Sequence, residues 1–192
     1  MRIVRLNKSN LQDSVDIIIE AFGDQYRRLF GVSPVRLKHF VKLSLETGET
    51  WVLGDSEVKG VLVLKHKLHE GTGYGDIFKI LAKSIPFWSI VYSARYVLAP
   101  KIVLKDSVHI SQIGVSKASR NQGVGFQLLE FAQTRAKELG FGSINLRVRA
   151  DNPAVNLYKR FGFTTFREIS SVVFSSTSGC KTVFYMVKNL VP

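Results

Sequence analysis

The N-terminal part of the chain alternates between the two periodicities that distinguish strands from helices. Residues 2–6 alternate charged and apolar side chains, which predicts a half-buried strand. Residues 11–22 repeat apolar side chains at helical spacing, which predicts an amphipathic helix that Gly23 ends. A second helix with its own apolar stripe is predicted to begin at Pro34 and to run to about residue 45.

Two short apolar runs follow and are expected to pair as a hairpin. They occupy residues 50–53 and 58–66, on either side of the turn sequence at 54–57. The second run is apolar at both alternating sets of positions, which is typical of a central strand covered on both faces of its sheet.

The C-terminal half continues as strands and helices in alternation, and it ends in a pair of strands. The predicted elements are strands at 108–115 and 143–148, helices at 126–139 and 152–161, and final strands at 163–174 and 182–187.

A long apolar segment separates the two halves. After the glycine-rich loop at 70–75, residues 77–98 are rich in large apolar groups and contain Pro86, which favours one or two helices. Lysine and arginine residues interrupt the segment, so it is not predicted to span a bilayer.

Length and composition place the chain among single-domain globular proteins. Its 192 residues are 45% hydrophobic and 22% charged, which is sufficient for one buried core over residues 1–192. The single cysteine, Cys180, excludes an intrachain disulfide and suits a reducing compartment. The N-terminal residues lack the apolar run of a signal peptide, so a cytoplasmic protein is expected.

The net charge of +12 favours an anionic partner, such as nucleic acid, an acidic membrane or a polyanionic cofactor. The basic residues are dispersed, and the chain has neither a long basic run nor a basic segment interleaved with aromatic residues. No specific nucleic-acid partner is therefore expected.

The segment from His109 to Gly125 carries the clearest candidate chemistry. It joins a predicted strand to the sequence R-x-x-G-x-G at the start of a predicted helix. Such a loop exposes backbone N–H groups at the positive end of a helix, which suits a pyrophosphate, although a simple tight turn would leave the same pattern. The residues concerned are Arg120, Asn121, Gln122, Gly123, Val124 and Gly125.

Two signatures in this half resemble those of the GNAT superfamily of N-acetyltransferases. The first is Ile113-Gly114-Val115 followed by Arg120 and the glycines, which is similar to the family's strand end and its Q/R-x-x-G-x-G/A loop. The second is NPAVNLYKRFGF at residues 152–163, which is similar to N-x-x-A-x-x-L-Y-x-x-x-G-F. The close match covers roughly residues 108–165.

The resemblance implies an α+β fold with three layers. Helices flank a mixed, mostly antiparallel sheet of about seven strands, splayed between the strands at 108–115 and 143–148. Residues at about 71–106 are then an insertion on the side where the acceptor enters in this family. The insertion is expected to be a helical pair packed on the core or a wall of the substrate site.

The resemblance also implies a set of coenzyme A contacts. Backbone groups of Ile113, Gly114 and Val115 would pair with the pantetheine arm, and a bulge would turn an N–H near Ile113 or Gly114 towards the thioester. The loop amides and Arg120 would bind the pyrophosphate. Asn152 and Asn156 complete the coenzyme-binding set, although Asp151 stands where the family has its asparagine, counting back from Tyr158.

Two residues are candidates for proton transfer. Tyr158 matches the family tyrosine that protonates the departing thiolate, and a phenol of pKa about 10 can serve a thiol that titrates near 8.5. His109 lies where the histone acetyltransferase branch has a glutamate that acts as the general base, and a histidine could serve the same role. Strand alternation is expected to place His109 on one face with Ile113 and Val115. A structural histidine combined with a water relay is the alternative.

These features predict a transferase that moves an acetyl group from acetyl-CoA to a primary amine by direct attack in a ternary complex. The acceptor is a small molecule or a peptide, no metal is expected, and a homodimer stays open. The alternatives are a non-catalytic acyl-CoA-binding module and a nucleic-acid-associated protein of the same fold.

Overall fold

The computed structural model describes residues 1–30, 33–46, 48–66, 104, 106–170 and 179–190. The predicted insertion at about 71–106 and the end of the predicted strand at 163–174 lie largely outside the described residues. No helix within the described ranges combines the length and the apolar character that crossing a bilayer requires.

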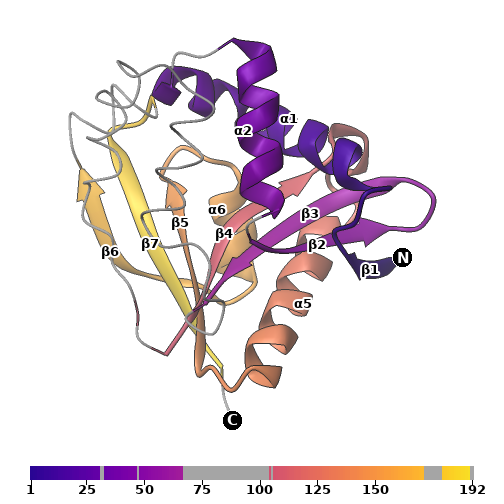
Figure 1. The fold of residues 1–192 in the computed structure, drawn as a ribbon. Coiled ribbons are helices and arrows are strands. Elements are labelled where there is room, and N and C mark those ends of the chain that lie inside the picture. Colours follow the sequence, from indigo (N-terminus) through magenta and orange to yellow (C-terminus); the bar gives the residue numbers. More distant parts are fainter. Residues whose placement is uncertain (31–32, 47, 67–103, 105, 171–178, 191–192) are drawn as a thin grey trace.

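The elements follow the predicted order (Figure 1). They are β1 (Arg2–Arg5), α1 (Leu11–Phe30), α2 (Pro34–Glu46), β2 (Glu49–Gly54), β3 (Val58–Lys65), β4 (Val108–Val115), the 3-10 turn η1 (Lys117–Ser119), α5 (Val124–Glu138), β5 (Ser143–Arg149), α6 (Ala154–Arg160), β6 (Thr164–Ser170) and β7 (Thr182–Asn189).

The seven strands form one mixed sheet in the order β1-β2-β3-β4-β5-β7-β6. Every pair is antiparallel except β4 with β5, which is parallel. The fold class implied by the GNAT resemblance is therefore confirmed.

Helices cover both faces of the sheet and make it the middle of three layers (Figure 1). Helices α1 and α2 pack on one face of β2 and β3, through a core that includes Ile18, Leu37 and Val61. Helices α5 and α6 share the core on the other face, which includes Leu62 and Leu128. We call these the α1/α2 face and the α5/α6 face.

Helix α1 is longer than its pattern predicts, because it continues through Gly23 to residue 30. A glycine inside a helix costs about 1 kcal/mol relative to alanine. Aromatic packing outweighs that cost, since the ring of Tyr26 lies 6.0 Å from that of Phe22 and 5.6 Å from that of Phe40 on α2. The prediction that Gly23 ends the helix was wrong.

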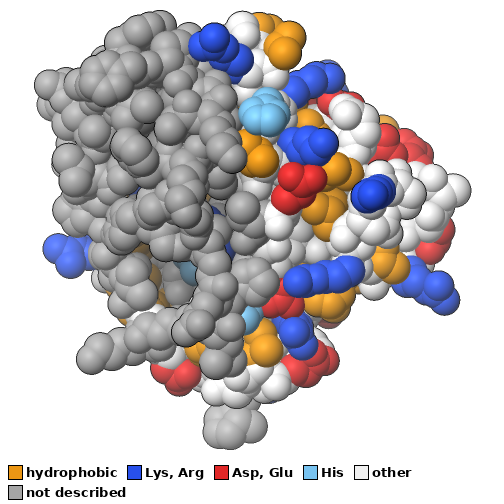
Figure 2. All heavy atoms as spheres, in the orientation of Figure 1, with side chains coloured by type: hydrophobic (Ala, Val, Ile, Leu, Met, Phe, Trp, Pro, Cys, Tyr) orange, Lys and Arg blue, Asp and Glu red, His pale blue; other side chains and the backbone are white. Residues whose placement is uncertain are grey.

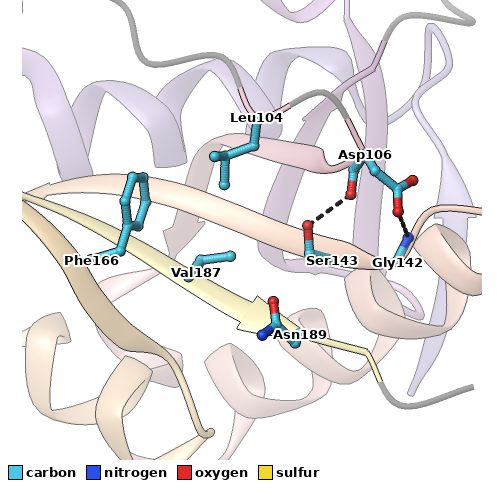
Figure 3. Close-up of a pocket in the computed structure, with 7 residues that line it drawn as sticks. All are labelled: Leu104, Asp106, Gly142, Ser143, Phe166, Val187 and Asn189. Atoms are coloured by element: carbon cyan, nitrogen blue, oxygen red, sulfur yellow. Dashed lines mark hydrogen bonds between the residues drawn. The ribbon is translucent and has the colours of Figure 1, made fainter.

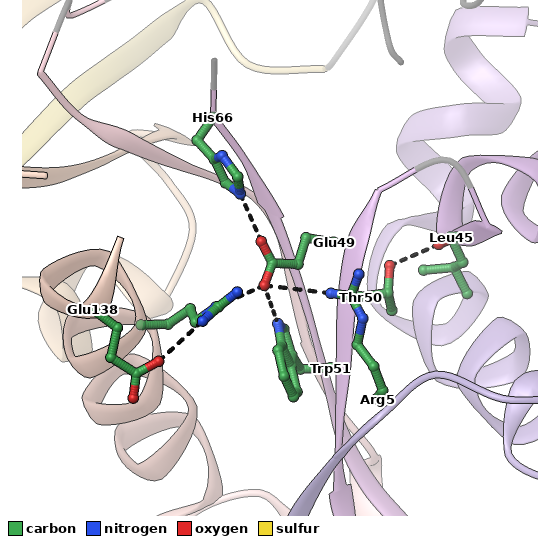
Figure 4. Close-up of polar contacts among 8 residues, drawn as sticks. Arg5, Leu45, Glu49, Thr50, Trp51, His66 and Glu138 are labelled. Atoms are coloured by element: carbon green, nitrogen blue, oxygen red, sulfur yellow. Dashed lines mark hydrogen bonds and ion pairs between the residues drawn. The ribbon is translucent and has the colours of Figure 1, made fainter. Parts of the chain in front are cut away.

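A buried carboxylate ties β1, β2, β3 and α5 together (Figure 4). The side chain of Glu49 is only 3% exposed. Its Oε1 accepts hydrogen bonds from Arg135 Nε at 2.8 Å and Trp51 Nε1 at 3.1 Å, and it lies 3.4 Å from Arg5. Its Oε2 lies 2.6 Å from Nε2 of His66.

These partners decide the ionisation of Glu49. Burial acts most strongly and raises the pKa of the carboxyl group, but the hydrogen bonds from His66 and Arg135 and the charges of Arg135 and Arg5 together hold its pKa below the usual range. Glu49 is therefore an anion at neutral pH that compensates the cations around it.

We predict that Glu49→Ala lowers the free energy of unfolding by roughly 3 kcal/mol, because it leaves buried donors and a cation without their partner. Urea denaturation at neutral pH measures the change. Glu138→Ala is the matched control, since it removes an exposed carboxylate from the same Arg135 and should cost less than about 1 kcal/mol.

The effect of Glu49 should also depend on pH. A carboxyl group whose pKa falls on folding stabilises the protein fully above its unfolded pKa of about 4.3, and the contribution is lost as the pH falls below that value. The difference between wild type and Glu49→Ala should therefore shrink in acid. A difference that stays constant down to the acid transition would show that Glu49 acts through packing alone.

Candidate functional site

Strands β4 and β5 pair over only part of their length and then separate. They pair at only three rungs, Val108–Ile144, His109–Asn145 and Ile110–Leu146. Beyond the last rung β4 continues to Val115, paired only with β3, and β5 continues to Arg149, paired only with β7. The β5 side of residues 111–115 therefore keeps backbone groups that no described strand pairs, which can bind an extended ligand.

A bulge in β4 lies at the start of this opening. Ile110 pairs with Leu64 and Gln112 with Val63, so Ser111 is the extra residue in β4. The bulge was expected near Ile113 or Gly114, and its position is therefore corrected to Ser111.

The bulge reverses the faces of the residues that follow it. Ile113 and Val115 pack in the core on the α5/α6 face, whereas His109 and Gln112 pair with residues on the α1/α2 face. The expectation that His109 shares a face with Ile113 and Val115 was wrong, because it assumed unbroken alternation.

Gly114 lies on the α1/α2 face and makes room for a helix. A Cβ at this position would lie 3.1 Å from Ile18 and 3.2 Å from Ile17, both on α1. The close backbone approach that glycine allows here is to α1.

The predicted phosphate loop runs from η1 into α5. Asn121 and Gly123 adopt the left-handed backbone conformation, with φ of 61° and 78°. No side chain caps the start of α5 at Gly123, so the first amides of the helix lack a capping acceptor. The Gln122 side chain turns back to donate to the carbonyl of Ala118 at 2.8 Å. The loop thus presents amides at the positive end of a helix.

Helix α1 holds this loop through Glu20, a residue that the sequence patterns did not single out. Its carboxylate accepts a hydrogen bond from the amide of Lys117 at 3.1 Å and lies 3.6 Å from the guanidinium of Arg120. The Nε of Arg120 also donates to the carbonyl of Val115 at 3.4 Å. Arg120 is therefore directed along the loop at the end of β4.

Helix α6 packs directly on the start of α5. A Cβ at Gly125 would lie 2.9 Å from Leu157, so the missing side chain here serves helix packing. The ring of Phe126 also contacts that of Phe161 at 5.0 Å.

Tyr158 lies on α6 within the core that also includes Ile113 and Val115. It is 6% exposed, and burial raises the pKa of its hydroxyl, so the phenol is protonated at neutral pH. Its ring packs on Phe163 at 5.9 Å. Within the described residues the hydroxyl forms no hydrogen bond, which leaves it able to donate to a ligand.

The asparagines before Tyr158 have different surroundings. Asn152 accepts a hydrogen bond from the amide of Ala154 at 2.9 Å and so shapes the start of α6. Asn156 is exposed on that helix. Asp151 pairs with Arg149 at 2.9 and 2.6 Å. The contacts proposed for Asn152 and Asn156 with a coenzyme stay predictions.

His109 lies at the narrow end of the opening, and it is hydrogen-bonded. Its Nδ1 lies 2.7 Å from Oδ1 of Asn145, whose Nδ2 donates to Ser107 Oγ at 2.6 Å. Pairing between β4 and β5 thus brings His109 and Asn145 together, although they are far apart in the sequence.

A cavity of about 430 Å³ lies elsewhere, at the opposite end of β5 from Arg149 (Figure 3). Its floor includes Ser143, whose hydroxyl donates to the carbonyl of Asp106 at 2.8 Å, and Gly142, whose amide donates to the Asp106 carboxylate at 3.1 Å. Phe166 and Val187 line another side. None of the residues that line this cavity belongs to the loop between β4 and α5.

On the visible face of the described residues, basic side chains are interspersed with acidic ones (Figure 2). Within the same residues, no three His, Cys, Asp or Glu side chains are grouped as metal ligands.

Comparison with known proteins agrees with this fold. A family model described as the acetyltransferase (GNAT) domain matches residues 80–173. A comparison with curated protein sequences finds no significant match.

Solved structures share the fold at low sequence identity. A protein described as an acetyltransferase is 19% identical with a TM-score of 0.69, and the alignment covers 100% of both chains. A histone acetyltransferase HPA2 and related acetyltransferase from Corynebacterium glutamicum is 21% identical with a TM-score of 0.66, covering 99% of this chain and 96% of that one. A Bacillus subtilis acetyltransferase in complex with CoA is 18% identical with a TM-score of 0.59, covering 99% of both chains.

We predict that Arg120→Ala weakens coenzyme A binding by about ten- to a hundredfold, because Arg120 is the side chain predicted to make a charge-assisted contact with the pyrophosphate. Isothermal titration calorimetry measures the change. Lys137→Ala is the matched control, since it removes an exposed cation at the far end of α5. Pantetheine lacks the pyrophosphate, so its affinity should not change. An equal loss for both ligands would contradict the assignment.

Proposed function

Because this chain has the fold of the GNAT acetyltransferases, we propose that it transfers an acetyl group from acetyl-CoA to a primary amine. The fold supports acyl transfer from an acyl-CoA. The acetyl donor, the amine acceptor and direct attack in a ternary complex are the specific parts of the proposal.

The observation that carries the proposal is the opening between β4 and β5 beside the uncapped start of α5. The unpaired edge of residues 111–115, which includes Ile113, Gly114 and Val115, supplies backbone partners for the amide-containing pantetheine arm. The amides of Gln122 to Gly125, with Arg120, supply the site for the pyrophosphate. One extended ligand with a peptide-like arm and a diphosphate fits both features.

The chemistry then follows from the groups around the opening. The neutral amine attacks the thioester carbon, and a tetrahedral oxyanion forms that backbone N–H groups of β4 near the bulge would stabilise. The C–S bond breaks, the thiolate takes the Tyr158 proton, and the nitrogen gives up its surplus proton to His109 or water. Acetylated amine and free coenzyme A leave, and Tyr158 regains a proton from solvent.

A thiol-release assay with a panel of amines tests the proposal. The panel comprises amino sugars, polyamines, free lysine and short peptides, and acetyl-dependent release of coenzyme A with at least one of them is expected. Tight acetyl-CoA binding without release for any amine would favour the non-catalytic binding module instead. Salt-dependent binding to random DNA at physiological ionic strength would favour the nucleic-acid-associated protein.

We predict that Tyr158→Phe lowers kcat by about ten- to a thousandfold, within the usual range for a lost general acid. The KM for acetyl-CoA should change little, because the hydroxyl acts mainly in the transition state. Steady-state kinetics with the best amine of the panel measures both constants.

Thermal unfolding and coenzyme A affinity are the controls for this variant. Both should match wild type, because the ring that packs on Phe163 is retained. Wild-type turnover in Tyr158→Phe, under conditions where chemistry limits the rate, would remove Tyr158 from the mechanism.

A further inference from the structure

We propose that Asn145, held by Ser107, is a positioning residue that fixes His109 as the Nδ1–H tautomer, so that Nε2 takes the proton of the acceptor amine. This inference rests on the proposed acetyl transfer. His109 and Asn145 lie on β4 and β5, the two strands whose separation forms the opening.

The three side chains form a chain of short hydrogen bonds. Asn145 Oδ1 lies 2.7 Å from His109 Nδ1, and Asn145 Nδ2 lies 2.6 Å from Ser107 Oγ. Ser107 and Asn145 are each only 7% exposed, and His109 is half-buried. A buried amide held at both ends has little freedom to turn away from the imidazole.

The direction of these bonds decides which nitrogen is the base. An amide oxygen can only accept, so the Nδ1 that faces Asn145 Oδ1 must carry the hydrogen. In a neutral imidazole the other nitrogen, Nε2, then holds the lone pair. Asn145 thus orients His109 in the way that the third residue of a catalytic triad orients its base.

The position of the pair in the sheet suits proton transfer. His109 and Asn145 form the second of the three β4–β5 rungs, and only Ile110–Leu146 separates them from the opening. They share the α1/α2 face, while Tyr158 packs on the α5/α6 face. The candidate base and the candidate acid therefore lie on opposite faces of the sheet.

Cations share the face of His109. Lys65 lies opposite it in the β3–β4 register, and Arg147 follows Asn145 by two positions on β5, with Tyr185 opposite Arg147 on β7. Lys65, Arg147 and Tyr185 are thus titratable groups of the described strands that share this face with His109. None of the described β3, β5 or β7 residues paired in these rungs is a carboxylate.

NMR of protein labelled with ¹⁵N-histidine tests the tautomer directly. At a pH where His109 is neutral, its Nδ1 should show the shift of a protonated nitrogen and its Nε2 that of an unprotonated one, with His109→Ala used to assign the signals. The opposite tautomer would overturn the proposal, because the amide would then be turned with its NH₂ group towards the histidine.

Kinetics tests the role in turnover. Asn145→Ala should lower kcat/KM for the amine by about ten- to a hundredfold without changing coenzyme A affinity. If His109 is the base, kcat/KM rises with pH through an inflection at which the imidazole loses its proton. Asn145→Asp should restore part of the rate and move this inflection to higher pH, because a carboxylate stabilises the imidazolium. His109→Ala should abolish that inflection.

Asn189→Ala is the matched control. It makes the same change on β7, where Asn189 is exposed and pairs with Ser143 rather than with the His109 rung. It should leave kcat/KM and the pH profile unchanged. An Asn145→Ala profile that overlays wild type would overturn the positioning role. If no amine is acetylated, the proposed function fails, but the NMR measurement still decides the tautomer.

Discussion

The architecture of the site depends on one interruption of backbone pairing, the separation of β4 from β5 beyond the Ile110–Leu146 rung. Both strands keep their other neighbours, so the sheet stays continuous while it opens at one end. The backbone N–H and C=O groups of a strand edge inside a protein need hydrogen-bond partners. At the opening, a ligand or water can supply these partners. Because the loop into α5 follows directly from the same end of β4, one extended ligand can satisfy both.

The bulge at Ser111 places the residues on either side of it on different faces of the sheet than unbroken alternation would. Before it, His109 points with Asn145 towards the α1/α2 face, and after it Ile113 and Val115 join the core that contains Tyr158. A single extra residue therefore lets one strand present a candidate base to one side and an apolar wall to the other. Regular alternation over the same length would have put these side chains on one face.

Helix α1 contacts the end of β4 and the loop that follows it in the C-terminal half. Its Ile17 and Ile18 fit against Gly114, and its Glu20 holds the amide of Lys117 and the guanidinium of Arg120. At the other end of α5, Glu49 joins the hairpin to Arg135. The loop before α5 is thus held by α1, and the far end of α5 is held by β2. Such rigidity is what a site built from backbone amides requires.

The sequence by itself determined the order of the elements, the glycine loop at the start of α5 and the placement of Tyr158 on α6. These features rest on periodicity and on loop residues that are close in the chain, so local patterns report them. The tertiary structure alone decided the bulge at Ser111, the continuation of α1 through Gly23, and the pairs His109–Asn145, Glu20–Lys117 and Glu49–Arg135. The paired residues are 36, 97 and 86 positions apart, and a local pattern carries no information about partners that only the register of the sheet and the packing of helices bring together.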